Sequence, residues 1–129
     1  MLDGLSFFKL ASQRLSWLSA RQKVVSENIA NADTPAYKAR DVTPFDAMVK
    51  GTRTGLATTA SGHIGGGAMG GTLSVRPDET GWETSLDGNT VVLEQQTVKA
   101  SEISEQYKLA TQLYRKGHEL LALSATGLR

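Results

Sequence analysis

The sequence predicts a mainly α protein, with two long terminal helices forming a coiled-coil layer in an assembly and a small irregular or β middle region. One observation is a series of apolar and weakly polar residues at spacings of three and four near the N-terminus. This N-terminal seam comprises Phe8, Ala11, Leu15, Leu18, Gln22, Val25, Ile29 and Ala32. A second series, the C-terminal seam, comprises Leu93, Gln96, Ala100, Ile103, Tyr107, Ala110, Tyr114, Gly117, Leu121, Ser124 and Leu128. This alternation is typical of helices that pack along a heptad seam. The third observation is that the sequence between the seams is non-helical in character.

The chain divides into five predicted segments. They are an N-terminal coiled-coil helix, a turn and extended segment, a flexible Gly-rich loop, a small β or irregular element and a C-terminal coiled-coil helix, at residues 1–32, 33–50, 51–71, 72–90 and 91–129. A helix at each terminus, with little apolar sequence between, indicates an assembly subunit more than an enzyme.

The first helix is predicted over residues 5–32, with Asp3 or Ser6 as its N-cap. It should stop at about Ala32, because Thr34 precedes Pro35 and is biased away from helical geometry. The turn should swing the chain outward. The apolar anchors that follow it should then pack on a neighbouring surface instead of extending the seam; they are Tyr37, Val42 and Phe45.

The middle of the chain combines a low-complexity stretch with weak strand signals. Residues 51–71 are dominated by Gly, Thr, Ser and Ala, a composition that buries little and predicts a mobile loop. Short strands are predicted at Thr72–Val75 and Trp82–Ser85. Asp87-Gly88-Asn89 is a strong turn signal.

The second helix is predicted over residues 91–126, with Asn89 or Thr90 as its N-cap. Glu94 lies in the first turn, where a carboxylate favours the helix dipole, and Gly127 should end the helix. Within the helix, Gly117 costs about 1 kcal/mol relative to alanine, and on the seam it would let another backbone come close.

The composition argues against several functional classes. The net charge is +1 and no segment is strongly basic, so nucleic-acid binding is not indicated. The chain has no cysteine, which removes disulfides and thiolate metal sites. His63 and His118 stand apart, without the spacing of metal ligands or of a catalytic dyad. We therefore expect no catalytic residue, no metal, no cofactor and no small-molecule substrate.

The seams admit two interpretations, which are compatible with each other. They could pack the two helices into an ordinary hairpin, or they could pack against other chains. Small residues make the seams weak cores for an isolated pair, and polar seam residues often fix register between chains. We predict an isolated chain that is only partly folded, and an assembly interface of Phe8, Leu15, Leu18, Val25, Ile29, Leu93, Ile103, Tyr107, Tyr114, Gly117 and Leu121.

The segment Asn28-Ile-Ala-Asn-Ala-Asp-Thr-Pro-Ala-Tyr-Lys-Ala-Arg-Asp-Val closely resembles the N-terminal signature of the bacterial flagellar rod and hook proteins, and most of all that of a proximal rod member. Leu86-Asp-Gly-Asn-Thr-Val-Val-Leu-Glu94 resembles the turn into the C-terminal helix of the same proteins. The resemblance covers residues 1–50 and 85–129. Its motif residues are Asn28, Asn31, Thr34, Pro35 and Tyr37. Ala36 stands where glycine is common and slightly restricts the turn.

The resemblance implies a structural subunit of the proximal rod of the flagellar basal body, the drive shaft of bacterial motility. It implies a helical assembly whose terminal helices form a coiled-coil layer around the export channel. The chain would leave the cytoplasm through the type III export apparatus without a cleaved signal peptide and become part of a periplasmic rod. Its partners would be copies of itself, other rod subunits, the rod–ring junction protein, the membrane-ring protein and the export gate. The alternative is a cytoplasmic coiled-coil adaptor or regulator.

Overall fold

The computed structural model describes residues 2–50 and 73–127, and it is mainly helical, as predicted. The elements in chain order are α1 (Leu2–Ala30), β1 (Arg40–Val42), β2 (Val75–Pro77) and α3 (Leu93–Ala125), and residues 45–50 are also helical. The Gly-rich stretch 51–71 lies outside the described residues. Among those that are described, no helix combines the length and the apolar character that a membrane crossing requires.

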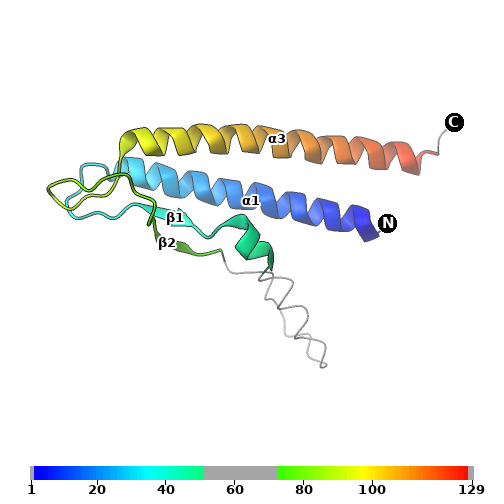
Figure 1. The fold of residues 1–129 in the computed structure, drawn as a ribbon. Helices are drawn as coiled ribbons and strands as arrows, with labels where there is room; N and C mark the ends of the chain where they lie inside the picture. Colours follow the sequence, from blue (N-terminus) through cyan, green and yellow to red (C-terminus); the bar gives the residue numbers. More distant parts are fainter. Residues whose placement is uncertain (1, 51–72, 128–129) are drawn as a thin grey trace, which may run out of the picture.

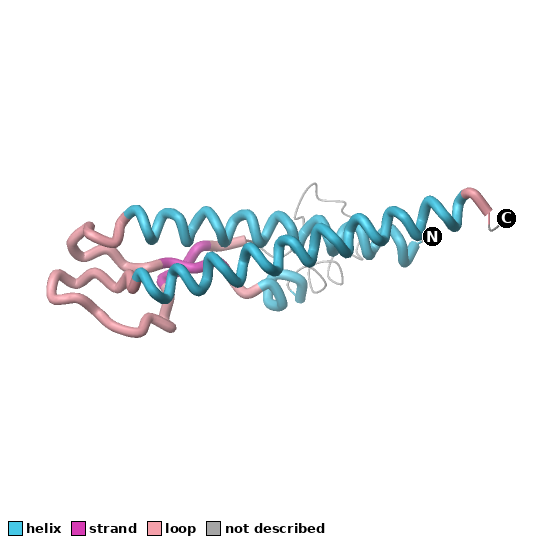
Figure 2. The backbone as a smooth tube through the Cα atoms, turned by 90° about the horizontal axis from the view of Figure 1, so that it is seen from above, coloured by secondary structure: helices cyan, strands magenta, loops and turns pink. Residues whose placement is uncertain are grey.

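The two long helices run antiparallel and side by side, so that the two chain ends lie together (Figures 1 and 2). The two-stranded sheet packs against α1 on the side away from α3 (Figure 1). As a result, α1 is the central element of the fold. Both loops that connect strands to helices meet at the end opposite the termini.

Helix α1 ends at Ala30, two residues earlier than predicted, and it does so by tightening its hydrogen bonds. The Asn31 amide donates to both Glu27 O and Asn28 O, and the Ala32 amide donates only to Ile29 O. The chain therefore leaves the helix before Pro35 enforces the break. At the other end, α1 begins at Leu2 and runs through Asp3 and Ser6, so the prediction that one of them caps it was wrong.

Helix α3 begins at Leu93, and its N-cap is Val92, which makes no side-chain capping bond. The predicted caps Asn89 and Thr90 were wrong, because their side chains bind the segment after α1 instead. Glu94 does lie in the first turn. The C-terminal prediction is confirmed, since the helix ends at Ala125 and Gly127 follows with φ +69°.

The strands pair differently from the prediction. Strand β2 lies near the predicted 72–75 segment, but its antiparallel partner is β1, with Val42 opposite Val75. The predicted strand Trp82–Ser85 was wrong; this stretch is irregular and exposed. The pairing follows burial, because β1 sits on α1 and buries Val42 there, whereas Trp82 stays 63 % exposed and residues 82–85 take no part in the core.

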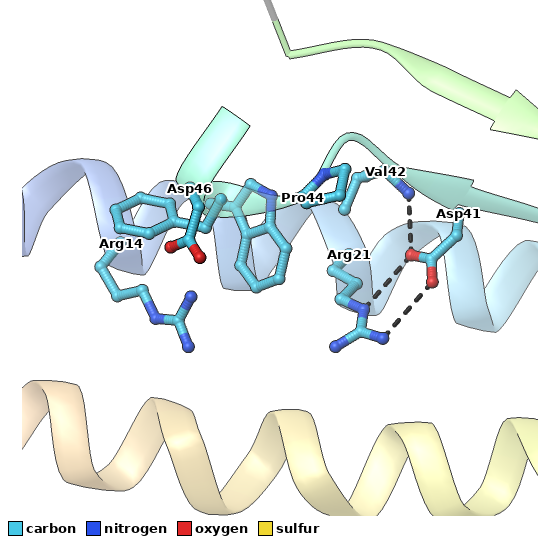
Figure 3. A pocket seen from close by; sticks show the side chains of 8 residues that line it. Arg14, Arg21, Asp41, Val42, Pro44 and Asp46 are labelled. Carbon is cyan, nitrogen blue, oxygen red and sulfur yellow. Dashed lines mark hydrogen bonds and ion pairs between the residues drawn. The ribbon is translucent and has the colours of Figure 1, made fainter. Parts of the chain in front are cut away.

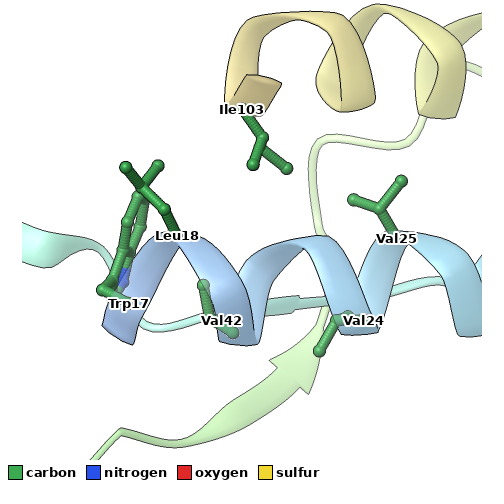
Figure 4. Packing of buried hydrophobic residues seen from close by; sticks show 6 residues of the cluster. All are labelled: Trp17, Leu18, Val24, Val25, Val42 and Ile103. Carbon is green, nitrogen blue, oxygen red and sulfur yellow. The ribbon is translucent and has the colours of Figure 1, made fainter. Parts of the chain in front are cut away.

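A small core joins the three layers at the middle of α1. It consists of Trp17, Leu18, Val24, Val25, Val42 and Ile103. In Figure 4, Leu18 and Val25 point toward Ile103 of α3, while Val24 and Val42 lie on the sheet side of α1. Phe45 packs on Trp17, with ring centroids 5.8 Å apart. The neighbouring surface predicted for the anchors after the turn is therefore α1 of the same chain.

Candidate assembly interface

The structure divides the predicted interface residues between intrachain contacts and exposed positions. Those buried or in contact across the helix pair are Leu18, Val25, Ile103, Phe8, Tyr114 and Gly117. Those between 41 and 49 % exposed are Ile29, Leu93, Tyr107 and Leu121. Leu15 is half-buried. Each seam thus closes part of the intrachain pair and leaves apolar side chains along an open edge.

Gly117 accommodates an aromatic ring instead of the backbone that we expected. A Cβ atom on Gly117 would lie 2.5 Å from Cε1 of Phe7. Phe8, on the same turn of α1, contacts Tyr114 with ring centroids 5.4 Å apart. His118 lies against Phe8 and Tyr114 as an exposed helical residue, and His63 lies outside the described residues. Glycine therefore brings the aromatic side chains of α1 close to α3.

Asn28 is the polar centre of the fold and is fully buried. Its Nδ2 donates to Arg40 O at 2.8 Å and to Gln96 Oε1 at 3.0 Å. Its Oδ1 accepts from the Arg40 amide at 3.0 Å and from the Tyr37 hydroxyl at 3.3 Å. One side chain therefore links α1, the motif turn, β1 and α3, which explains why the motif needs an amide at position 28.

Asn89 forms a second clamp from the other side of the chain, and it is also buried. Its Nδ2 lies within 3.0 Å of the carbonyl oxygens of Asn31, Ala32 and Thr34, all of which follow α1. Its Oδ1 accepts from the Val91 amide at 2.7 Å. Asn89 thereby satisfies carbonyl groups that the end of α1 leaves without helical partners. We call Asn28 and Asn89, with their partners, the asparagine clamp.

An ion-pair network links α1, β1, α3 and the residue after β2. Lys99 of α3 binds Asp78, which follows β2, and also Asp41 of β1 at 3.4 Å. Arg21 of α1 binds the same Asp41 at 3.2 Å. Burial raises the pKa of Asp78, but hydrogen bonds from Lys99 and Thr80 outweigh it and hold the pKa below its ordinary value. The network therefore favours a charged Asp78 in the folded chain.

Three of the cavities formed by the described residues lie against α1. Two are apolar, of about 390 and 360 Å³, and lie along the open edge of the helix pair; Tyr107 lines the first and Leu121 the second. The third, of about 400 Å³, lies between α1 and the segment after β1 and contains two arginines beside Trp17 and Phe45 (Figure 3). No cluster of three or more potential metal-ligating side chains occurs within residues 2–50 and 73–127.

Sequence reasoning missed a further apolar stripe on α3. Its members, all more than half exposed, are Leu109, Leu113, Leu120 and Leu123. Their spacings of four, seven and three residues are those of a second heptad series, so the signal was present in the sequence. The first seam obscured it, because a helix packed on one partner needs only one such series.

The comparisons with known proteins match the part of the chain that contains the turn. A family model described as flagella basal body rod protein matches residues 8–38, which span most of α1 and the turn held by the asparagine clamp. The flagellar basal body rod protein FlgB of Agrobacterium fabrum is 36 % identical over 127 residues, covering 95 % of each chain. This chain belongs to the FlgB family. The FlgB proteins of Escherichia coli and Salmonella typhimurium are 31 and 34 % identical and cover 85 and 84 % of this chain, and 86 % of their own length.

Membership in the FlgB family confirms the resemblance drawn from the two motifs, and with it the prediction of a structural rod subunit. The structure adds a physical reason for the motif. The Tyr37 hydroxyl donates to Asn28, and the Asn89 side chain donates to the Thr34 carbonyl oxygen of the same turn. The two motifs therefore meet in space, although they are far apart in sequence. The FlgB signature at residues 28–42 and the second one at 86–94 therefore form a single structural unit.

Proposed function

We propose that this chain is a structural subunit of the proximal flagellar rod and that it assembles through the exposed apolar faces of α1 and α3. Ile29, Leu93, Tyr107 and Leu121 leave the seams half open, and the leucine stripe of α3 adds a second uncovered face. Apolar area of this extent on two sides of one helix is costly in water and is typical of a surface that another chain covers.

The open edge supports helix packing between subunits. The lining of the cavity beside Tyr107 includes three small side chains, Ser19, Ala100 and Ser104, which leave room for a knob from another helix. The cavity beside Leu121 is apolar and lies between Phe8 and Leu120. Repeated contacts of one such edge with a different face of the next subunit produce an open helical assembly.

Membership in the FlgB family supports a role for this assembly in the basal body rod. The partners we propose are further copies of this chain, other rod subunits, the rod–ring junction protein, the membrane ring and the export gate. The location we propose is the periplasmic rod, around the export channel and reached by type III export without cleavage of a signal peptide. A structural role accounts for the described residues without any catalytic step.

The proposal is tested by introducing an aspartate into the leucine stripe. Leu113→Asp should leave export largely intact and abolish swimming, because assembly would bury an unpaired charge. Gln112→Asp is the matched control, since it adds the same charge to the same exposed turn without removing an apolar side chain. Secretion assays and motility halos separate export from assembly. Normal swimming of the Leu113→Asp strain would overturn the proposal.

A further inference from the structure

The loop after β2 exposes two large apolar side chains among carboxylates. Trp82 is 63 % exposed and Leu86 is fully exposed. Glu79, Glu83 and Asp87 are exposed in the same loop, and no lysine or arginine occurs between Arg76 and Lys99. Exposed tryptophan is uncommon on a surface that faces only water, and tryptophan dominates many binding interfaces. We call residues 79–88 the acidic tryptophan loop.

The loop is held in place at both ends. Asp78 binds Lys99 and accepts a hydrogen bond from the Thr80 amide, and Gln95 Nε2 donates to Thr80 O at 2.9 Å. At the other end, the Ser85 amide donates to Asn89 O and the Gly88 amide donates to Ser85 O. The loop therefore projects from the end of the molecule opposite the termini in a defined shape, which lowers the entropy lost on binding (Figure 1).

The cavity of about 400 Å³ beside α1 is lined by two arginines, two aspartates and the rings of Trp17 and Phe45, and Arg14 is the group that could receive a further carboxylate. The Arg14 guanidinium lies 4.8 Å from the Trp17 ring centroid and 4.9 Å from that of Phe45. Its only hydrogen bond among the described residues goes to the neutral Gln106 Oε1, at 3.1 Å. Arg21 is already bound by Asp41, as the dashed lines in Figure 3 show.

Asp46 faces the same cavity and attracts Arg14, but it lies beyond ion-pair distance. Burial and the neighbouring Arg21 lower the pKa of Arg14, so its surroundings disfavour the charge that it carries. A carboxylate brought to this guanidinium from outside would relieve that cost, and its neighbour could stack on the aromatic walls.

We propose that the acidic tryptophan loop of one copy docks into the arginine–aromatic cavity of a second copy, with Glu83 paired to Arg14 and Trp82 packed against the half-buried ring of Phe45. The proposal rests on the proposed rod function and names one of its subunit contacts. The loop lies at one end of the molecule and the cavity beside the middle of α1, so the contact joins two different surfaces. A heterologous contact of this kind continues from subunit to subunit and suits an open helical assembly.

The absence of native cysteine makes the contact directly testable by disulfide cross-linking in cells. One full-length copy carries Glu83→Cys and a second copy carries Asp46→Cys, and both are produced in a strain lacking the native protein. We expect an oxidised dimer of the two chains in purified basal bodies, at least fivefold above the level with Glu102→Cys in place of Glu83→Cys. Glu102 is the matched control, because it is an exposed carboxylate on α3.

Charge exchange provides a second measurement that a purely structural role of Arg14 would not reproduce. Arg14→Glu and Glu83→Arg should each lower the swimming rate severalfold, and the double variant should restore most of it. Incorporation of the chain into basal bodies without the Glu83–Asp46 cross-link, or cross-linking of Glu83→Cys to a different rod protein, would overturn this inference and leave the rod function standing. Absence of the native chain from purified basal bodies would overturn both.

Discussion

The two halves of the helix pair share one sequence pattern but differ in burial. In the clamp half, residues 17–42 and 89–103, the seams enclose the core, and the asparagine clamp and the ion-pair network surround it. In the distal half, residues 6–16 and 104–127, no described residue is buried. A heptad series therefore predicts which face of a helix packs against another helix. Whether that face is buried within one chain depends on the additional layer formed by β1 and the turn.

The difference has a physical origin in the number of layers. In the clamp half, α1 is covered by α3 on one side and by β1 on the other. In the distal half, a pair of helices stands almost alone, and two helices in isolation bury too little apolar surface to offset the chain entropy of both. Under the proposed function, the distal half is the part of the fold that other subunits would cover.

The largest expected effect is in hydrogen exchange. We predict that backbone amides of residues 17–30 and 93–104 are protected at least about 100-fold more than those of residues 6–14 and 107–125 in the isolated chain. Mass spectrometry of the exchanged chain would measure it. Equal protection along both helices would show that the distal half is stable without partners.

A matched pair of leucine truncations tests the same contrast by free energy. Leu18→Ala should lower the free energy of unfolding by about 3 kcal/mol, because Leu18 is fully buried and its truncation removes apolar contacts from the core. Leu113→Ala should change it by less than about 0.5 kcal/mol, because Leu113 is 53 % exposed. Urea unfolding followed by circular dichroism measures both. Similar losses at the two positions would contradict the division into halves.

Local patterns in the sequence predicted the two long helices, the turn between α1 and β1, and the C-terminal end of α3, but not the N-caps of the two helices. The seams predicted α1 and α3, Pro35 and the residues before it predicted the turn, and Gly127 predicted the last helix end. The non-local features were not predictable in the same way. Asn28 and Gln96 are 68 residues apart, and nothing near either one specifies the other.

The predicted cap at Asn89 shows why local rules failed where distant segments meet. An asparagine just before a helix has the same local signature whether it caps that helix or binds another segment. Here the Asn89 side-chain amide donates to the carbonyl groups of Asn31, Ala32 and Thr34, so the segment after α1 binds the side chain that the local rule assigns to a cap. The β1–β2 pairing was missed for the same reason, because strand partners are chosen by burial on α1.

A moderate effect is expected for acidification of the ion-pair network. The pKa of Asp78 in the folded chain lies below its unfolded value of about 3.8, so the stabilisation is present above that value. It is lost as the pH falls through the lowered folded pKa. Asp78→Asn should therefore reduce the loss of stability below about pH 4, and Lys99→Gln should act in the same direction, because Lys99 supplies the main favourable bond. Thermal unfolding across this range would measure both, and an unchanged acid response in the two variants would exclude the network as its source.

The smallest expected effect concerns the turn where the two motifs meet. Ala36 has φ +62°, in the left-handed region that disfavours a Cβ atom, and its amide donates to Asp87 O at 2.9 Å. Opposite it, Gly88 has φ +83°, and a Cβ there would lie 3.5 Å from the Ala36 Cα. The left-handed conformation of Ala36 is thus held by its contacts with Asp87 and Gly88.

Ala36→Gly and Gly88→Ala should change the free energy of unfolding in opposite directions. Ala36→Gly relieves a strain of about 1 kcal/mol, but it also loosens the unfolded chain, so we expect a net gain of about 0.5 kcal/mol. Gly88→Ala should cost about 1 to 2 kcal/mol, because it adds the same strain at a second position. Urea unfolding of the two variants and of the double variant measures the change in the free energy of unfolding for each. The two changes should not add in the double variant if the strain at Ala36 depends on the residue at position 88. A loss of stability in Ala36→Gly would mean that chain entropy outweighs strain at this turn, and that the clamp tolerates alanine without penalty.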